Sequence, residues 1–562
     1  LEGEVAQPVE VAGELGVVYR GDMTQSTRET ERKYEVPDTG GFPTLAALSR
    51  EGKGADGKTK GKGKSKGKKR ARAESPGLSL VDGGAHDLDA VYYDTADLRL
   101  ARSAATLRRR TGGPDAGWHL KLPLPGDDRD EIRAPLQDGV PERLRELALS
   151  RTRGARLQPV VRIRSRRSVR DLVDADGTVL AEVALDRVDA DSLRPEGGHA
   201  SWAELEVELA PGHGDPALLD RVENALGAEG FTRSGSASKL ARALSDTAAD
   251  AAGDSGAKSA PRTASGPRPR PGTAGAEFHA YFTEQVRALV DLDPAVRRGL
   301  PDSVHRMRVA CRRLRSCLRS YRSLVAREVT DPVRADLRWL GGELGAERDQ
   351  EVLVQRLREG VDRLPGELVL GPVSARLQAW DVTKSAEARE RSLDALSSPR
   401  YVALLDALDR IVADPPLRAG AAKKAAKALP KALGKEFDRL ADRVDRALRT
   451  PAGPERDAAL HEARKKAKRL RYAAEAARPA LGKPAKRLSK SVKSVQKALG
   501  DHHDGVVARD ALRRHAVAAH AAGEPGFTWG LLYGREQAAA EAREESLPEL
   551  WRAAARARPR KV

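Results

Sequence analysis

A low-complexity segment near the middle of the 562-residue chain divides it into two halves of different character. Residues 246–276 are polar and rich in Pro, Gly, Ala and Ser, which is typical of a linker between domains. Before this segment, short runs alternate polar and apolar residues between turn residues, a pattern of β-strands. After it, Ala, Leu, Arg and Glu recur with a helical period. We therefore predict an N-terminal tail at 1–24, an α+β domain at 25–245 and an all-α domain at 277–562.

The charge of the chain is unevenly distributed. Lys and Arg total 100 against 82 Asp and Glu, a net charge of +18, which indicates a polyanionic partner. Half of this surplus lies in residues 50–72, where eleven Lys or Arg accompany only Glu51 and Asp56. Because this Lys/Gly-rich stretch has almost no apolar side chain to bury, we expect a disordered insertion at residues 50–77. It would act as a solvated spacer or as a flexible tether for a polyanion.

The sequence also bears on the cellular setting. No apolar run reaches the roughly 18 residues of a membrane-spanning helix, and the first residues are acidic where a signal peptide would be basic, so we expect neither a membrane protein nor export. Cys311 and Cys317 lie six residues apart in a helical pattern, about 9 Å along the axis and beyond the reach of a disulfide. Two free thiols favour a reducing, cytoplasmic environment.

Charged residues, in most cases of like sign, line up on single faces of the predicted strands. Because side chains alternate along a strand, Glu29, Glu31 and Lys33 share one face. The same alternation aligns Glu204, Glu206 and Glu208; Arg108 and Arg110; and Arg162, Arg164 and Arg166, while Lys121 lies between two leucines. A solvent-exposed polar face would explain the alternation alone. Stacked like charges repel unless an opposite charge lies between them, so a shared lumen that holds a divalent metal and a phosphate chain is the second interpretation.

The stretch Glu29-Thr30-Glu31-Arg32-Lys33 resembles the ExExK signature of CYTH domains, the triphosphate tunnel metalloenzymes. Further blocks follow in that family's order: Tyr92–Thr95, Arg108 with Arg110, Lys121, the second Arg cluster, Asp186, Glu204–Glu208 and Ser238-Lys239. The resemblance implies an antiparallel barrel whose tunnel binds Mg²⁺ or Mn²⁺ and a triphosphate, so that water can attack the terminal phosphorus.

Carried over block by block, the resemblance also implies site residues. The metal ligands would be Glu29, Glu31, Glu204, Glu206 and Glu208, joined by Asp186. The groups central to catalysis would be Glu29, Glu31, Lys33 and Glu206. The phosphate-binding residues would be Lys33, Arg108, Arg110, Lys121, Arg133, Arg162, Arg164 and Lys239.

The helical half contains an internal repeat. In the first copy His305 precedes Leu344 by 39 residues, and in the second His461 precedes Leu499 by 38, which indicates a duplicated helical unit. Each copy carries an apolar stripe at helical spacing, and beside it a basic stripe. The basic stripes are His305, Arg308, Arg312, Arg315, Arg319 and Arg322 in the first copy, and His461, Arg464, Lys468 and Arg471 in the second, where Glu475 ends the row.

These blocks resemble the CHAD domain, the conserved-histidine helical domain that is often fused to CYTH domains. The resemblance covers residues 277 to about 550 and implies two four-helix repeats with a basic surface that binds inorganic polyphosphate. The residues carried over are His305, Arg308, Arg312, Arg315, Arg319, Arg338, His461, Arg464, Lys468, Arg471 and Lys493. The second copy has His503 where the first has Arg348, so this position is expected to be neutral near pH 7.

Three functions remain open at this stage. The first is a polyphosphate-binding protein with a Mg²⁺- or Mn²⁺-dependent triphosphatase domain, cytoplasmic and able to associate with polyphosphate granules. The second is a scaffold that binds polyphosphate without catalysis. The third is a nucleic-acid-binding protein, which the 4% aromatic content disfavours because bases need aromatic platforms to stack on. The sequence does not choose among tripolyphosphate, nucleoside triphosphates, thiamine triphosphate and polymer ends.

Overall fold

The computed structural model describes residues 25–48, 77–251 and 268–558, apart from 39, 46, 196, 213 and 214. The chain separates into two compact units between Pro261 and Arg262, inside the predicted linker. Helices α5 (Lys239–Ala251) and α6 (Ala274–Arg297) extend into the two ends of that linker, which is therefore shorter than predicted. The predicted tail at 1–24 and nearly all of the predicted insertion at 50–77 lie outside the described residues.

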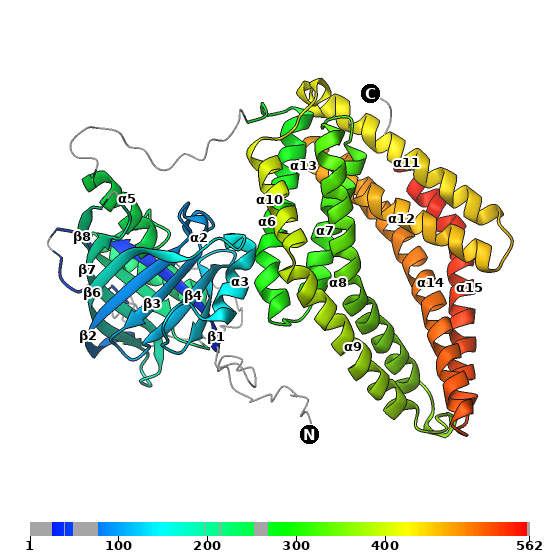
Figure 1. Ribbon diagram of the computed structural model, residues 1–562, viewed down its shortest axis with the longest axis horizontal. Coiled ribbons are helices and arrows are strands. Elements are labelled where there is room, and N and C mark those ends of the chain that lie inside the picture. The colour runs from blue at the N-terminus through cyan, green and yellow to red at the C-terminus, as the bar shows by residue number, and fades with distance from the viewer. Residues whose placement is uncertain are drawn as a thin grey trace, which may run out of the picture. The chain divides into compact units, whose positions relative to one another are not determined.

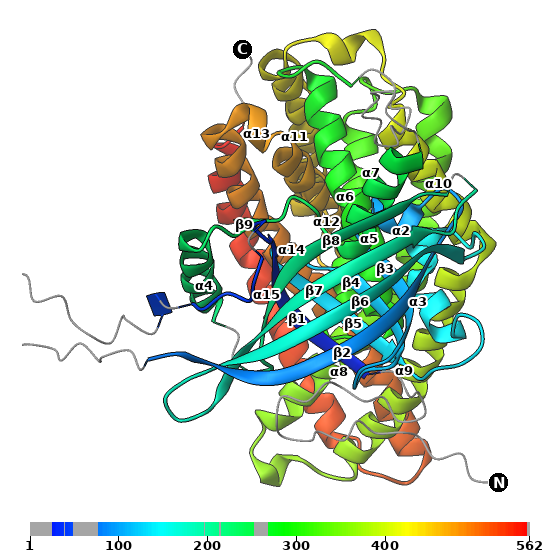
Figure 2. The same cartoon turned by 90° about the vertical axis from the view of Figure 1, so that its left-hand side faces the viewer.

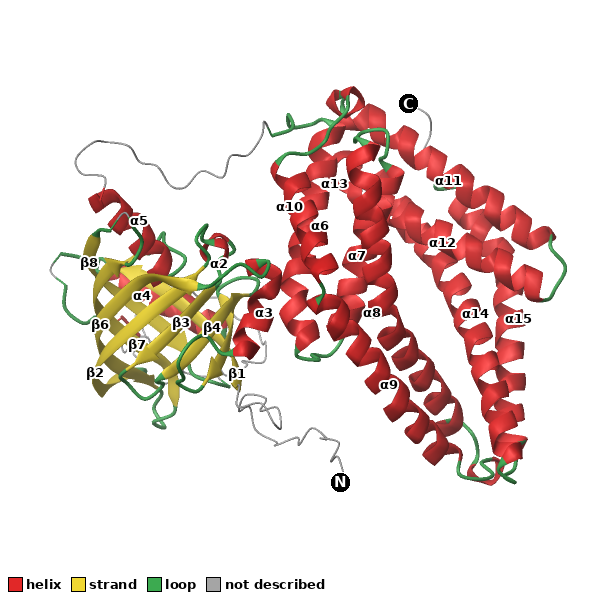
Figure 3. Cartoon of the chain, in the orientation of Figure 1, coloured by secondary structure: helices red, strands yellow, loops and turns green. Residues whose placement is uncertain are grey.

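The first unit is built on an antiparallel barrel, as predicted (Figures 1 and 3). Its strands are β1 (Gln25–Glu35), β2 (Ser79–Asp94), β3 (Thr106–Thr111), β4 (Gly117–Pro123), β5 (Asp128–Ala134), β6 (Gln158–Val173), β7 (Val179–Ser192) and β8 (His199–Leu209). They pair in the order β5-β4-β3-β2-β6-β7-β8-β1, and β1 also pairs with β5, which closes the barrel. A short strand β9 (Thr232–Arg233) adds to β1. Figure 2 shows β2, β6, β7 and β8 side by side.

Helices cover the barrel on its outside and fill one end of its inside. Helix α3 (Glu142–Thr152) packs its leucines on Leu107, Trp118 and Leu120, which point outward from β3 and β4. Helix α4 (Pro216–Ala228) packs on outward residues of β1, β7 and β8. Helix α5 instead contacts Val161 and Ile163, which share the inner face of β6 with Arg167. The lumen is therefore apolar beside α5 and lined by charged residues elsewhere. A short helix α2 (Arg99–Arg102) follows β2.

The second unit is helical and repeats one order of helices. The first copy comprises α6, α7 (Ser303–Ser320), α8 (Arg327–Asp362) and α9 (Val373–Ser397), and α10 (Pro399–Ala413) follows it. The second comprises α11 (Ala425–Arg449), α12 (Pro454–Ala476), α14 (Lys483–Ala521) and α15 (Phe527–Ala555), with the short α13 (Arg478–Leu481) inserted. Successive long helices of each copy pack together, and the copies meet through α7 with α12, α6 with α11 and α8 with α14. These contacts agree with a duplicated fold.

The two predicted apolar stripes form the core of this unit. Met307, Cys311 and Leu314 are at most 1% exposed and join one large cluster with Leu460 and Leu470 of the second copy. Burying a leucine side chain of this kind contributes about 1.5–3 kcal/mol. Both cysteines are free, as predicted, and both are buried. No helix of the described residues has the length and apolar character to cross a membrane.

A smaller apolar cluster joins the far ends of α8, α9, α14 and α15. It includes Leu357 of α8, Leu377 of α9, Leu512 of α14 and Trp529 of α15. Between the large core and this cluster, the hairpin α8/α9 and the hairpin α14/α15 diverge and then converge again (Figure 1).

Candidate functional site

A cavity of about 380 Å³ occupies the barrel lumen. Alternation along each strand directs one set of side chains inward, and most of that set is charged. The charged residues that line the cavity include Glu29, Glu31, Lys33, Arg108, Arg110, Lys121, Glu131, Arg133, Arg167, Glu182, Glu206, Glu208 and Lys239. The lumen therefore contains acidic and basic groups together, as the second interpretation of the strand pattern predicted.

One acidic cluster in the lumen consists of Glu29 and Glu31 of β1 and Glu208 of β8, with carboxylate oxygens within 4.8 Å of one another. Burial and the nearby Glu208 raise the pKa of Glu29 to about 8, even though Lys121 donates to Glu29 at 2.5 Å. Burial also raises the pKa of Glu208. Lys33 and Lys121 lower the pKa of Glu31 against the effect of burial. Two of the three carboxylates thus lack enough neighbouring positive charge, and a hard divalent cation with a preference for oxygen ligands fits this set.

A second acidic cluster consists of Asp186 of β7 and Glu204 and Glu206 of β8. Lys239, at the start of α5, lies 2.9 Å from Asp186, 2.8 Å from Glu204 and 2.6 Å from Glu206. Arg167 also pairs with Asp186 and Glu206. Although burial opposes it, these cations lower the pKa values of Asp186 and Glu206. Because lysine and arginine already balance this cluster, a metal ion fits it less well than the first cluster.

Glu131 of β5 is a central acidic residue that the sequence analysis missed. It is 1% exposed and is approached by Arg133, by Lys121 at 3.4 Å and by His119 at 3.0 Å. Against the effect of burial, Lys121 and His119 hold the pKa of Glu131 well below its usual value. Burial lowers the pKa of His119 to about 4. The alternation Arg129, Glu131, Arg133 was the signal for this residue, because it places an acid between two arginines on one face.

The basic side of the lumen contains Arg108, Arg110, Lys121 and Arg133, which the sequence analysis assigned to phosphate. Burial, Arg108 and Arg167 lower the pKa of Arg110 to about 9. Arg110 pairs with Asp115, yet a further anion beside Arg110 would offset the effect of Arg108 and Arg167 on it. This part of the lumen therefore fits a phosphate group.

The prediction that Arg162 and Arg164 enter the tunnel is wrong. Their side chains are 47% and 54% exposed on the outer face of β6, where they pair with Asp89 and Asp191. The inward positions at this end of β6 belong to Val161 and Ile163, which pack against α5. Arg167, an odd-numbered residue of the same strand, enters the lumen instead.

The basic stripes of the helical unit meet in one hollow of about 890 Å³. Both copies line it, with His305, Arg308, Arg312, Arg315, Arg338, Arg348, Arg356, His461, Arg464, Lys468 and His503 among its residues. A second hollow of about 520 Å³ shares Arg312, Arg315, Arg338 and Lys468 with the first, and adds Arg319, Arg334 and Arg469. The two hollows together form the basic groove. Of the predicted polyphosphate-binding residues, nine line it.

The two copies contribute equivalent ion pairs to the basic groove. Arg308 pairs with Asp349 at 3.0 Å in the first copy, and Arg464 pairs with Asp504 at 3.2 Å in the second. Each aspartate ends the LGxxxD block that marks its copy in the sequence. The repeat found in the sequence therefore has a direct counterpart in side-chain pairing.

Positive groups crowd one another in the basic groove. Burial and the nearby Arg464 and Arg312 lower the pKa of Lys468 to about 7. Burial and Arg464 lower the pKa of His503 to about 4, so this side chain is neutral near pH 7, as expected. His461 lies against it, with the two Nδ1 atoms 3.1 Å apart. A polyanion in the groove would relieve the repulsion among these cations.

Two predicted polyphosphate-binding residues lie outside both hollows. Arg471 pairs with Glu475 at 3.5 Å and stacks over the Tyr472 ring. Lys493 is exposed on α14. Glu475 also pairs with Arg313 at 3.3 Å. Its charge therefore offsets the positive charge of both arginines beside α12.

Comparison with known proteins identifies both units. The CYTH domain family matches residues 58–244 and the CHAD domain family matches residues 280–513. The chain belongs to the CYTH and CHAD domain-containing proteins. CYTH domains include triphosphatases and cyclases and generally depend on a divalent metal, and CHAD domains are linked to polyphosphate binding. Strand β1 precedes the matched CYTH range, yet it closes the same barrel.

The chain is similar to a Mycobacterium tuberculosis (strain CDC 1551 / Oshkosh) protein, "Uncharacterized protein MT2285", with 40% identity over 474 residues, covering 82% of this chain and 88% of that one. Among solved structures, PptA from Streptomyces chartreusis is 23% identical with a TM-score of 0.43, covering 50% of this chain and 99% of that one. The CHAD domain from the plant Ricinus communis is 25% identical with a TM-score of 0.40, covering 53% and 96%.

Proposed function

We propose that the barrel is a Mg²⁺- or Mn²⁺-dependent triphosphatase and that the helical unit binds inorganic polyphosphate. The observation that supports the first part is the composition of one lumen, where the carboxylates of Glu29, Glu31 and Glu208 lie near crowded arginines. A triphosphate bound to a divalent ion carries negative charge that the arginines would complement and positive charge that the glutamates would complement. Membership of the CYTH family supports the same reaction class.

The acidic and basic residues of the lumen would have different roles, the first toward the ion and the second toward the phosphates. Glu29, Glu31 and Glu208 would hold the ion, which when bound neutralises charge on the phosphoryl oxygens. Arg108, Arg110, Lys121 and Arg133 would grip and orient the phosphates. Glu131 pairs with Arg133, Lys121 and Arg108, the last at 3.8 Å, and so would fix the directions of these cations. Lys239 and Arg167 keep Asp186 and Glu206 ionised and in place.

Phosphate release from a panel of substrates tests the triphosphatase. The panel contains tripolyphosphate, ATP, thiamine triphosphate and long polyphosphate, each with Mg²⁺ and with Mn²⁺. Glu31→Gln removes one charge of the first acidic cluster and should lower turnover by roughly a hundredfold or more. Glu142→Gln is a matched control, because Glu142 lies exposed on α3. A wild-type protein that releases no phosphate from any member would refute catalysis and favour the scaffold.

The basic groove supports the second part of the proposal. Among the residues that line its two hollows, Tyr472 is the one Phe, Tyr or Trp, and its ring lies under Arg471 rather than open to a base. A groove that has arginines and lysines but few large aromatic rings favours a polyanion that has no bases. In a competition assay with full-length protein, unlabelled polyphosphate should displace labelled polyphosphate far better than single-stranded DNA of equal phosphate content. Equal displacement would restore the nucleic-acid alternative.

A further inference from the structure

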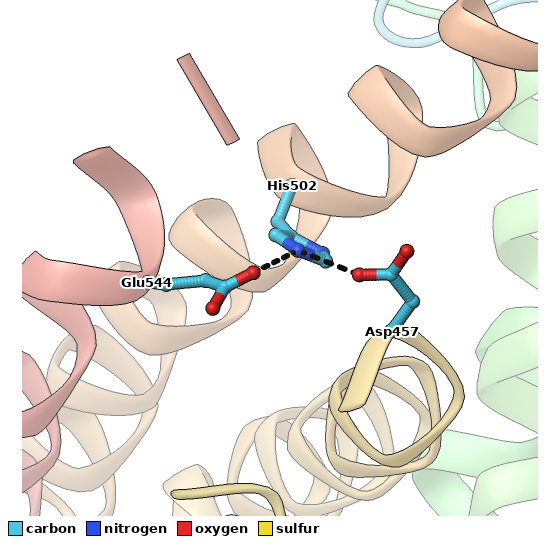
Figure 4. Close-up of side chains that lie close together, drawn as sticks. All are labelled: Asp457, His502 and Glu544. Atoms are coloured by element: carbon cyan, nitrogen blue, oxygen red, sulfur yellow. Dashed lines mark hydrogen bonds and ion pairs between the residues drawn. The ribbon is translucent and has the colours of Figure 1, made fainter. Parts of the chain in front are cut away.

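Three side chains from three helices converge in the second copy, outside the barrel and outside the basic groove (Figure 4). His502 of α14 places its Nε2 2.9 Å from a carboxylate oxygen of Glu544 on α15 and 3.3 Å from one of Asp457 on α12. The three candidate ligand atoms lie within 4.8 Å of one another. His502 is 2% exposed, whereas the side chains of Asp457 and Glu544 are 24% and 17% exposed. The cluster is buried on the histidine side and reachable by water on the carboxylate side.

The convergence places two carboxylate oxygens on one ring nitrogen. An imidazole Nε2 carries at most one proton, and one proton forms one well-aligned hydrogen bond. Here two carboxylate oxygens approach that same nitrogen. Three electron-pair donors directed at one another form the arrangement that a metal ion satisfies.

A second layer of residues holds the carboxylates in this orientation. Arg456 forms an ion pair with the outer oxygen of Glu544 at 3.0 Å, and Arg509 donates a hydrogen bond to the outer oxygen of Asp457 at 3.3 Å. The inner oxygens, which face His502, are left to the centre of the cluster. Partners that orient the ligands of a metal are a regular feature of metal sites.

The ligand types indicate which metal would bind. Unlike Lys239 in the barrel lumen, which contacts all three carboxylates of its cluster, Arg456 and Arg509 contact only the outer oxygens and leave the positions that face His502 open. The imidazole of His502 indicates which metal would bind, because nitrogen ligands favour Zn²⁺ over Mg²⁺ and Ca²⁺. His502 follows Leu499 by three residues in the second copy. The residue that follows Leu344 by three in the first copy is Glu347, which Arg389 approaches at 3.7 Å. The cluster is therefore particular to the second copy.

We propose that Asp457, His502 and Glu544 form a zinc site that ties α12, α14 and α15 together. Water would complete the coordination on the exposed side. The next residue, His503, lines the basic groove, so the bound ion would fix the segment of α14 that contributes to the groove. This proposal does not depend on the activity of the barrel.

Zinc titration by calorimetry of full-length protein tests the proposal. Excess Mg²⁺ is present throughout, so that carboxylates in the barrel lumen are occupied. Wild-type protein should bind one more equivalent of Zn²⁺ than His502→Gln. His199→Gln is the matched control, because His199 contacts Asp191 at 2.9 Å but is 54% exposed on the barrel, and this variant should keep the extra equivalent.

A melting experiment covers the case in which His502→Gln does not fold. In a background of excess Mg²⁺, added Zn²⁺ should raise the Tm of the helical unit in wild-type protein, and this rise should be absent in Glu544→Gln and Asp457→Asn. Equal zinc stoichiometry in wild type and the folded variants, or a wild-type Tm that zinc does not change, would overturn the proposal and leave His502 as a hydrogen-bonding bridge. An equal rise with Mg²⁺ alone would also overturn it.

Discussion

Lys468 predicts how polyphosphate binding should respond to pH. Its pKa is lowered to about 7 by burial and by Arg464 and Arg312, so the free protein loses this charge as the pH rises above 7. A polyanion in the basic groove would stabilise the charged form and raise the pKa toward the ordinary value of about 10.4. Between these two values, binding would require the uptake of one proton, and affinity should fall as the pH rises.

The size of this effect follows from linkage. Uptake of one proton weakens binding by up to about tenfold for each pH unit, or about 1.4 kcal/mol, so Kd should rise by up to about a hundredfold between pH 7.5 and 9.5. The nearby His305, His461 and His503 have lowered pKa values and stay neutral over this range. Fluorescence titration with long polyphosphate at constant ionic strength measures the slope.

Lys468→Arg is the decisive control. Arginine keeps its charge throughout this pH range, so the variant should show a much flatter slope and tighter binding at pH 9.5. The internal phosphates of the ligand and all other groups of the protein are unchanged in this comparison. Equal slopes for wild type and Lys468→Arg would show that the crowding of cations around Lys468 does not govern binding.

Three further predictions follow from side-chain placement. Arg167→Gln should lower phosphate release at least about tenfold, whereas Arg162→Gln, on the outer face of β6, should change it less than about twofold in the same assay. Arg319→Ala should reduce the salt dependence of polyphosphate affinity by roughly one contact, and Lys493→Ala should leave that slope unchanged in titrations at several salt concentrations. Leu314→Ala removes a fully buried side chain from the helical core, so chemical denaturation should show a loss of about 2–5 kcal/mol in the unfolding free energy of the helical unit.

The alternation of residues predicted the strands, and the resemblance to CYTH domains implied the barrel, but neither predicted the side that each charged face of β6 would take. In β1 and β8 the charged residues point inward, because Tyr34, Leu205 and Val207 pack outward against α4. In β6 the apolar Val161 and Ile163 point inward, because α5 fills that end of the lumen. Periodicity fixes which residues share a face, whereas the helix that covers that face is a matter of tertiary packing.

The helical half shows the same limit. The spacing of Met307, Cys311 and Leu314 correctly identified the buried stripe, because a helix face is a local property. Which basic residues meet across the groove depends on how the two copies pack. Arg356 entered the groove from the long helix α8, where no stripe marked it, and Lys493 stayed outside despite its place in the repeat.

Glu475 makes the two ends of the basic groove different, although the fold is duplicated. Two similar copies form a basic groove with approximate twofold symmetry. Polyphosphate is a homopolymer whose two ends are alike. Without a further difference, it could therefore bind the groove equally well in either of two positions. Glu475 removes that equivalence, because it pairs with Arg313 and Arg471 beside α12, while the second hollow, which α7, α8 and α12 line together, keeps Arg319 and Lys466. The overhanging part of a long polymer should therefore leave the groove through the second hollow.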